Sequence, residues 1–266
     1  MWRNELATLF RRRRTQAVLA ALAAVPIAIT LVVRFAGGPD GGEGPTFLSQ
    51  VTHNGLFATL AGLTVTLPFF LPMAVSVVAG DALAGEASLG TLRYLLTRPA
   101  GRTRLLASKG LSAAVFCLSA TGIVAAAGLL AGVIFFPVGR VTTLSGDTLP
   151  LAQGAARMAL AALLIAVSML GLAAIGLFVS SLTDVPVGAM AGTLGTFILI
   201  GVLDALPQTR GIHPWLLTEH WLSFTDLLRT HVQWDGIVRN IGLTALYVGV
   251  FGTAAWARFT SKDVMA

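Results

Sequence analysis

Histidine and carboxylate side chains are the groups in this chain whose chemistry suits a bound metal ion. Residues 205–238 contain three of the four histidines and several carboxylates, among them His213, Glu219, His220, Asp226 and His231. Imidazole and carboxylate together can bind zinc or copper. The spacings match no compact ligand motif, however, and the aromatic neighbours favour anchoring at a membrane interface. We therefore predict no metal site in the chain.

Nucleotide binding and covalent catalysis lack the residues they need. A phosphate-binding loop requires G-x-x-x-x-G-K-[ST], but Lys109 and Lys262, the only two lysines, both follow serine. No serine nucleophile has a plausible histidine partner within the apolar runs, and no paired acidic motif suits a membrane prenyltransferase. Cys117 is the single cysteine, so no disulfide can form within the chain. We predict a protein that is not an enzyme and holds no cofactor.

The composition excludes a soluble globular protein. The 266 residues are 55% hydrophobic and 11% charged, and the mean hydropathy is +0.81, whereas an average soluble domain is about 25% charged. The apolar runs are long and unbroken, which disfavours a membrane barrel, because barrel strands alternate apolar and polar residues over roughly 10 positions. We predict an all-α, polytopic membrane protein that forms a single membrane domain over residues 1–266.

Six apolar runs are long enough to span a bilayer, since a helical span needs about 20 residues. Their approximate bounds are 16–36, 56–80, 110–136, 156–180, 185–204 and 239–257. None has an acidic or basic residue in its central portion. Pro68 and Pro72 predict a break or bend in the second run, because proline removes a hydrogen bond and kinks a helix. The alternative is that these two prolines serve only the packing of the helix.

Small residues in two spans suit close helix packing. Gly128 and Gly132, like Gly188 and Gly192, form a G-x-x-x-G pattern, which allows helix backbones to approach one another. The packing partner is either another helix of the same chain or a second subunit.

The basic residues predict the orientation. With the N-terminus in the cytoplasm, 12 of the 18 Lys and Arg residues fall on the cytoplasmic side, as the positive-inside rule requires. We predict a multi-pass protein of the cell membrane with both termini cytoplasmic. The basic residues that set this orientation then account for the net charge of +6. Arg11 to Arg14 are expected to contact anionic membrane lipid, and no nucleic-acid partner is needed.

Two further segments are predicted to be helical without spanning. Residues 2–14 carry apolar side chains at helical spacing with charges opposite, which is typical of a helix lying in the membrane interface. A simple topogenic tail is the alternative. Residues 205–238 are too polar to span and too apolar to be a plain linker. We predict one or two short re-entrant helices that enter the membrane from outside.

The long cytoplasmic loop, residues 81–109, begins with a helical pattern. Three leucines share one face: Leu89, Leu92 and Leu96. Glu86 and Arg93, seven residues apart, share an adjacent face. Because Pro99 restricts the residue before it, the helix should end at Arg98. Its apolar stripe must be buried against the membrane, the rest of the chain or a soluble partner.

A spaced motif runs through this loop. Its positions are Glu86, Gly90-Thr91-Leu92, Leu95-Leu96, Arg98-Pro99, Arg102 and Lys109. This pattern resembles that of the type-2 membrane subunits of ATP-binding-cassette exporters. Six spans, an N-terminal interfacial helix and a re-entrant segment before the last span extend the resemblance over the chain.

The resemblance implies that residues 81–97 form a coupling helix, which docks in a groove on a separate ATPase subunit that binds the ATP. The implied ATPase contacts are Glu86, Thr91, Leu92, Arg93 and Leu96, with Arg98, Pro99 and Arg102 shaping the exit of the loop. For the arginines the alternative is that they only enforce topology. The resemblance also implies a second permease subunit, as a homodimer or heterodimer, and export through a pathway between the two. It implies no particular substrate.

Two other functions are alternatives. A stand-alone secondary transporter or channel would need ion-binding groups at the middle of the membrane, where the spans offer only scattered serine and threonine. A membrane enzyme would need a catalytic set, and none is visible. The sequence favours the permease subunit.

Overall fold

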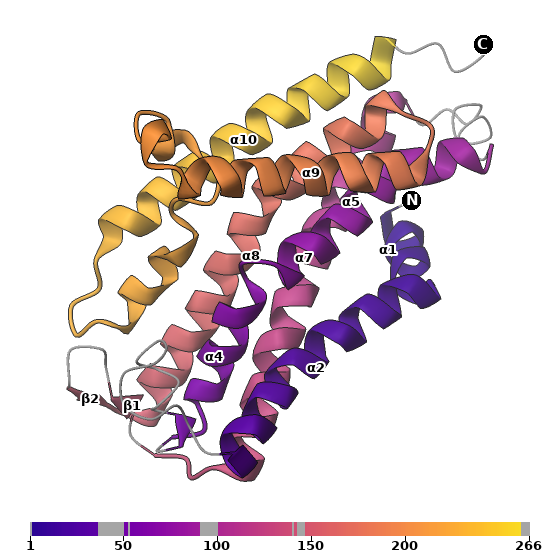
Figure 1. Ribbon diagram of the computed structural model, residues 1–266. Helices are drawn as coiled ribbons and strands as arrows, with labels where there is room; N and C mark the ends of the chain where they lie inside the picture. The colour runs from indigo at the N-terminus through magenta and orange to yellow at the C-terminus, as the bar shows by residue number, and fades with distance from the viewer. Residues whose placement is uncertain are drawn as a thin grey trace.

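The computed structural model describes residues 2–36, 51–52, 54–90, 101–139, 141–142 and 147–261 (Figure 1). Within these ranges the chain is almost entirely helical. The helices are α1 (Trp2–Arg11), α2 (Arg13–Ala36), α4 (Phe57–Thr66), α5 (Phe70–Ser88), α7 (Arg102–Phe135), α8 (Leu151–Leu182), α9 (Pro186–Ala205) and α10 (Trp234–Ser261). The shorter elements are strands β1 (Val141–Thr142) and β2 (Thr148–Leu149) and the 3-10 helices η1 (Pro207–Thr209), η2 (His213–Trp215) and η3 (Trp221–Leu228).

In the described ranges, six helices are long and apolar enough to cross a membrane: α2, α5, α7, α8, α9 and α10. The predicted number of spans is therefore confirmed, although several bounds move. Helix α7 has 34 residues and begins at Arg102 instead of residue 110. At 1.5 Å per residue it measures about 51 Å. It is thus longer than the roughly 30 Å hydrocarbon core of a bilayer, and it projects beyond that core.

The second predicted span is two helices, not one. Helix α4 ends at Thr66 and α5 begins at Phe70, so the continuous span over 56–80 is wrong and the predicted break is confirmed. Pro68 lies in the connecting turn, where its missing N–H group ends the hydrogen-bond ladder of α4. Pro72 falls in the first turn of α5, where no backbone N–H has an intrahelical acceptor. The break joins two helices that differ in direction.

Helix α8 is central in the bundle. It contacts α5, α7, α9 and α10, and many of its side chains are buried. Helices α2, α9 and α10 are peripheral, because most of each remains exposed in the isolated chain. Their outward faces are apolar, with Val32, Leu199 and Val250 among the exposed residues. In a membrane protein such faces suit lipid or another apolar subunit.

The first G-x-x-x-G pair packs inside the chain. A Cβ atom at Gly128 would lie 2.9 Å from the Ala58 carbonyl oxygen of α4, and one at Gly132 would overlap the backbone of Gly55. Gly192 faces Val179 of α8, whereas the atoms nearest Gly188 belong to Val185 in its own turn. The intramolecular interpretation therefore holds for the pair on α7.

The segment between α9 and α10 forms three short 3-10 helices, where one or two helices were predicted. Six of its apolar side chains are buried against the same chain, whereas Trp215 and Leu222 are exposed. The buried ones are Leu216, Leu217, Trp221, Phe224, Leu227 and Leu228. Trp221 stacks on Phe197 of α9, with ring centroids 5.7 Å apart. Asn240 of α10 donates hydrogen bonds to Ser168 of α8 and Ser223 of η3. Packing on α8, α9 and α10 thus accounts for part of the apolar content, and entry into the membrane remains a prediction.

The helix directions place the chain ends together. In Figure 1 the start of α1 and the end of α10 lie at the same end of the bundle, where α5 ends and α7 begins. The β1–β2 pair lies at the opposite end (Figure 1), with Val141 opposite Leu149 in antiparallel register. Which end faces the cytoplasm remains the prediction made from the basic residues.

Candidate functional site

The candidate site is the junction of α5 and α7, the position of the sequence motif. Glu86 lies near the end of α5 and Arg102 is the first residue of α7. The other predicted contacts fall outside the described residues: Thr91, Leu92, Arg93, Leu96 and Arg98. Leu89, the first leucine of the predicted stripe, is described and is 72% exposed.

Helix α5 ends earlier than the sequence pattern predicted. Its last residue is Ser88, and Gly90 has a φ of 67°. A glycine in this left-handed conformation is a common helix terminator, because it lacks the Cβ atom that disfavours positive φ. The prediction of one continuous helix over residues 81–97 is therefore wrong. Residues 81–88 are helical, as predicted, but they form the end of the apolar helix α5.

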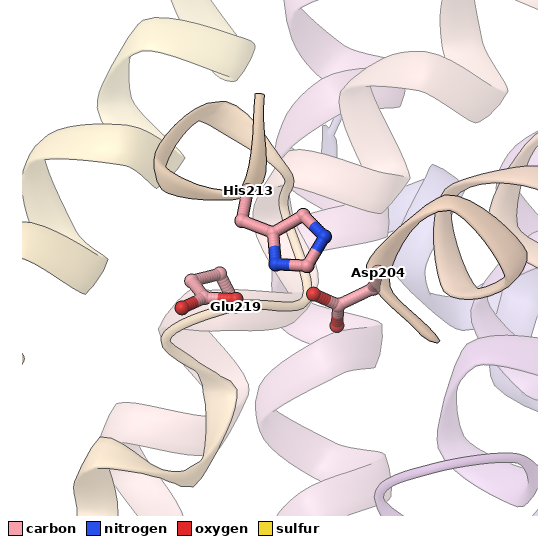
Figure 2. A group of neighbouring side chains, drawn as sticks. All are labelled: Asp204, His213 and Glu219. Carbon is pink, nitrogen blue, oxygen red and sulfur yellow. The ribbon is translucent and has the colours of Figure 1, made fainter. Parts of the chain in front are cut away.

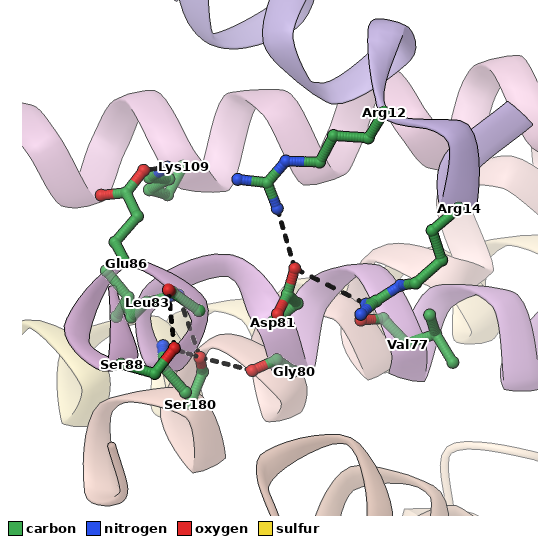
Figure 3. Close-up of polar contacts among 12 residues, drawn as sticks. Arg12, Arg14, Val77, Gly80, Asp81, Leu83, Glu86, Ser88, Lys109 and Ser180 are labelled. Atoms are coloured by element: carbon green, nitrogen blue, oxygen red, sulfur yellow. Dashed lines mark hydrogen bonds and ion pairs between the residues drawn. The ribbon is translucent and has the colours of Figure 1, made fainter. Parts of the chain in front are cut away.

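Glu86 points into the protein and pairs with Lys109 of α7 (Figure 3). The Lys109 ammonium also contacts Glu5 of α1, with an Nζ–Oε2 distance of 2.8 Å. The side chains of Lys109, Glu86 and Glu5 are only 7%, 12% and 17% exposed. Removing charges from water is costly unless they are paired. The role of Glu86 as an ATPase contact remains a prediction, while its contact with Lys109 joins α5 to α7.

A second ion pair joins the same helices to the N-terminal region. Asp81 of α5 accepts a hydrogen bond from Arg12 at 2.8 Å and lies 3.6 Å from Arg14 (Figure 3). Arg14 also donates to the carbonyl oxygen of Val77. We call the combined set the charge cluster; its members are Glu5, Arg12, Arg14, Asp81, Glu86 and Lys109. Three carboxylates and three cations give the charge cluster a formal charge of zero, and its ion pairs join α1, α2, α5 and α7. Arg12 and Arg14 are its most exposed members.

The hydroxyl group of Ser180 in α8 forms hydrogen bonds with backbone groups of α5. Its hydroxyl oxygen accepts from the N–H groups of Leu83 and Ala84 at 3.0 and 2.9 Å, and its hydroxyl donates to the Gly80 carbonyl at 2.6 Å (Figure 3). The backbone around Gly80 also lies close to α9, since a Cβ there would be 2.8 Å from Met190 Cα. Side-chain insertion of this kind is a recognised cause of local helix bending. The end of α5 is thus held by α8 and α9.

Arg102 holds the start of α7 against the end of α10. Its guanidinium donates to the Thr260 carbonyl at 2.7 Å, where a cation is favourable because the last carbonyls of a helix lack intrahelical donors. The indole of Trp256 donates to Thr103 at 3.0 Å. A small apolar cluster lies beneath these contacts, formed by Leu83, Leu105, Leu106, Ala255 and Phe259. Arg102 therefore anchors the exit of the loop within the chain.

The contacts at the junction of α5 and α7 are suited to transmitting movement between helices rather than to covalent chemistry. Residues 89–101 connect two helix ends, and each end is bonded to several other helices. Sequence reasoning identified Glu86, Arg102 and Lys109 but missed the partners Glu5, Asp81, Arg12 and Arg14. Charged side chains in apolar helices need partners, so the charges on α5 and α7 did indicate pairing. Which charges would pair depended on tertiary structure.

The predicted N-terminal helix is present as α1, and it packs against α7. Leu9 contacts the main core. Arg11 and Arg13 are exposed, while Arg12 and Arg14 turn toward Asp81. Two of the four consecutive arginines are therefore free to meet lipid, and the other two have structural partners in α5.

In the segment between α9 and α10, some of the histidine and carboxylate side chains that could bind a metal lie close together. His213 and Glu219 lie near Asp204, which is in the last turn of α9. Asp226 instead pairs with Arg229 at 3.0 Å. His220 lines a neighbouring hollow, and His231 does not belong to the group.

The fold and the spans define a multi-pass helical membrane protein. Its chain belongs to the family described as "Protein of unknown function (DUF2705)", which matches residues 45–265.

Two curated relatives carry a functional name. The chain is 34% identical over 119 residues to the "Probable ABC transporter permease protein NosY" of Pseudomonas aeruginosa, which covers 45% of this chain and 39% of that protein. It is 30% identical over 148 residues to the protein of the same name from Stutzerimonas stutzeri, and these residues cover 52% of this chain and 50% of that protein. The chain thus spans half the length of these relatives or less. The resemblance to ATP-binding-cassette permeases is confirmed.

Proposed function

We propose that this chain is the membrane-spanning permease subunit of an ATP-binding-cassette transporter, and that residues 89–101 receive the motion of a separate ATPase subunit. One observation carries the proposal most directly. Both ends of this segment are anchored, α5 through Glu86, Asp81 and Ser180, and α7 through Lys109 and Arg102. The names of the two relatives support the same function.

The anchoring gives a path for movement. A push on residues 89–101 displaces the ends of α5 and α7 together, because Lys109 and Glu86 join them. Asp81 and Glu5 transfer the displacement to α2 and α1. The turn between α4 and α5 and the Ser180 contact interrupt regular helix bonding, and such interruptions are where helices bend. The permease therefore changes the packing of its helices while the ATPase performs the hydrolysis.

The family resemblance supports the rest of the assembly. ATP binds to the partner, and this chain holds no cofactor and catalyses no covalent step. Two permease subunits, as a homodimer or heterodimer, form the pathway between them and move substrate outward. The exposed Arg11 and Arg13 contact anionic lipid. The chain lies in the cell membrane with both termini cytoplasmic.

The stand-alone transporter has less support. Among the described residues, many buried hydroxyls in the spans donate to carbonyls of their own helices, as Thr121 does to Cys117 and Thr193 to Ala189. The buried ion pairs gather at one end of the bundle. An ion carrier needs its titratable or coordinating groups along the path at mid-membrane.

Site-specific photo-crosslinking tests the proposed contact. A photoreactive amino acid at position 92, in membranes of the source organism, should form a crosslink to a protein that mass spectrometry identifies as an ATP-binding-cassette ATPase. Position 182 is the matched control, since Leu182 is an exposed leucine at the end of α8, two residues after Ser180, which contacts α5. Equal ATPase crosslinking from both positions, or from neither, would contradict the assignment.

A further inference from the structure

We propose that Asp204, His213 and Glu219 form a binding site for a divalent transition-metal ion of the zinc class. The inference is independent of the permease function. Asp204 lies on α9, His213 begins η2 and Glu219 lies in the turn before η3. One ligand atom from each residue lies within 4.8 Å of the other two. Figure 2 shows the imidazole ring between the two carboxylate groups.

The separation is close to what a shared ion requires. Zinc binds nitrogen and oxygen ligands at about 2.0–2.2 Å, which places tetrahedral ligand atoms about 3.4 Å apart. Asp204 and His213 are partly buried, while Glu219 is exposed. The exposed Glu219 side chain can therefore rotate toward an ion without displacing the core.

The hydrogen bonds of His213 prepare its other ring nitrogen for a metal. Nε2 lies 3.2 Å from the Leu206 carbonyl oxygen, which can only accept, so Nε2 carries the proton. Thr209 donates its hydroxyl proton to backbone carbonyls and can accept from the same Nε2. This tautomer leaves a lone pair on Nδ1. Metal-binding histidines commonly donate their second nitrogen to a carbonyl in this way.

Asp204 is oriented by a comparable contact. The Thr218 hydroxyl donates to Asp204 Oδ2 at 2.8 Å, which holds one carboxylate oxygen and leaves Oδ1 for an ion. Thr218 directly precedes Glu219, so this hydrogen bond also positions the third ligand. Outer contacts that fix carboxylate and imidazole ligands are typical of metal centres.

The charge of the group favours a cation. Within the described residues, neither Asp204 nor Glu219 forms a salt bridge. Two carboxylates and a neutral imidazole carry a formal charge of −2, and like charges at this separation repel one another. Glu219 also lines an open hollow of about 490 Å³, so one of the three ligands is accessible from outside the protein.

The donor set selects the kind of ion. Imidazole nitrogen favours zinc, copper, iron and nickel, whereas calcium prefers oxygen ligands alone. Three protein ligands leave a further position for water or a donor from another molecule. A bound ion would join the end of α9 to the segment between α9 and α10.

Calorimetric titration of the full chain in detergent with Zn²⁺ tests the site. We expect one ion per chain, and His213→Ala should weaken binding by more than about 100-fold, because loss of even an outer contact costs 10–100-fold. Thr218→Val keeps all three ligands and should weaken binding about 10-fold. His220→Ala and His231→Ala are matched controls that should leave the affinity unchanged.

Co²⁺ absorption gives a second readout that folding changes alone would not reproduce, because its visible bands report ligand type and geometry. The bands should be present in the unsubstituted chain and in His220→Ala, and lost in His213→Ala and Asp204→Asn. Circular dichroism checks that each variant is folded. Absence of Zn²⁺ binding, equal binding by His213→Ala, equal loss in His220→Ala, or Ca²⁺ binding as tight as Zn²⁺ would overturn the proposal.

Discussion

Lys109 is the residue on which the α5–α7 junction most depends. It is 7% exposed and contacts both Glu86 and Glu5. A buried ion pair adds little stability over a well-packed apolar pair, but removing one partner leaves an uncompensated charge. Lys109 therefore supplies one positive charge between two carboxylates that the fold holds away from water.

Replacing Lys109 by methionine keeps most of the side-chain volume and removes the charge. We expect Lys109→Met to lower the free energy of unfolding by about 3–5 kcal/mol, measured by thermal unfolding in detergent. Arg104→Met is the control, because Arg104 is exposed on the same helix and should change stability by less than about 0.5 kcal/mol.

A double substitution separates charge from packing. Glu86→Gln together with Lys109→Met should recover part of the lost stability, because residues in contact do not contribute additively. If Lys109→Met unfolds at the temperature of the unsubstituted chain, or if the two losses simply add, the charge cluster does not join these helices as described.

At the scale of the elements, close backbone contact between α4 and α7 fixes one side of the break in the second span. Gly128 faces the backbone of α4 and Gly132 faces Gly55, just before α4, and neither site leaves room for a side chain. Helix α4 is thereby held against α7. Beyond Pro68, α5 contacts α7 as well but is also bonded to α8 and α9, so the two halves of the broken span differ in their attachments.

Substituting the packed glycine tests this attachment. Gly128→Ala places a Cβ 2.9 Å from a backbone oxygen of α4, which cannot rotate away, and overpacking of this kind costs about 1–3 kcal/mol. Gly122→Ala is the matched control on the same helix, because a Cβ there meets nothing within 4 Å. It should be neutral or stabilising by up to about 1 kcal/mol, from helix propensity. Similar unfolding temperatures for the two variants would contradict the close contact.

The elements also show what a single sequence can and cannot predict. The spans were predictable because hydrocarbon requires long apolar helices whose backbone bonds are satisfied internally. The end of α5 was missed because leucine spacing continues past Gly90, and the left-handed glycine outweighed that spacing. Asp81 and its partner Arg12 lie 69 residues apart in the sequence, and Asp204 and His213, which lie near one another, are 9 residues apart. The first pair depends on tertiary packing, and the second depends on irregular 3-10 turns that local patterns do not predict.

At the scale of the whole molecule, six spans place both termini on one side of the membrane, and the basic residues predict that this side is cytoplasmic. A phosphatase reporter that is active only outside the cell should give no signal when fused to Ala266. The same reporter fused after Thr148, in the β1–β2 pair at the opposite end, should be active. Activity at Ala266 with silence at Thr148 would reverse the orientation.

The central claim is that the segment between α5 and α7 binds the ATPase that drives this permease. Its most direct test is co-purification of the ATPase with a Leu92→Asp/Leu96→Asp double variant. Burying charge in an apolar interface is costly, and central apolar contacts are each worth about 2 kcal/mol or more when lost. The variant should insert into the membrane normally, because both positions lie outside the spans, yet lose the ATPase. Leu182→Asp should retain it. Unchanged ATPase recovery with the double variant would contradict the account.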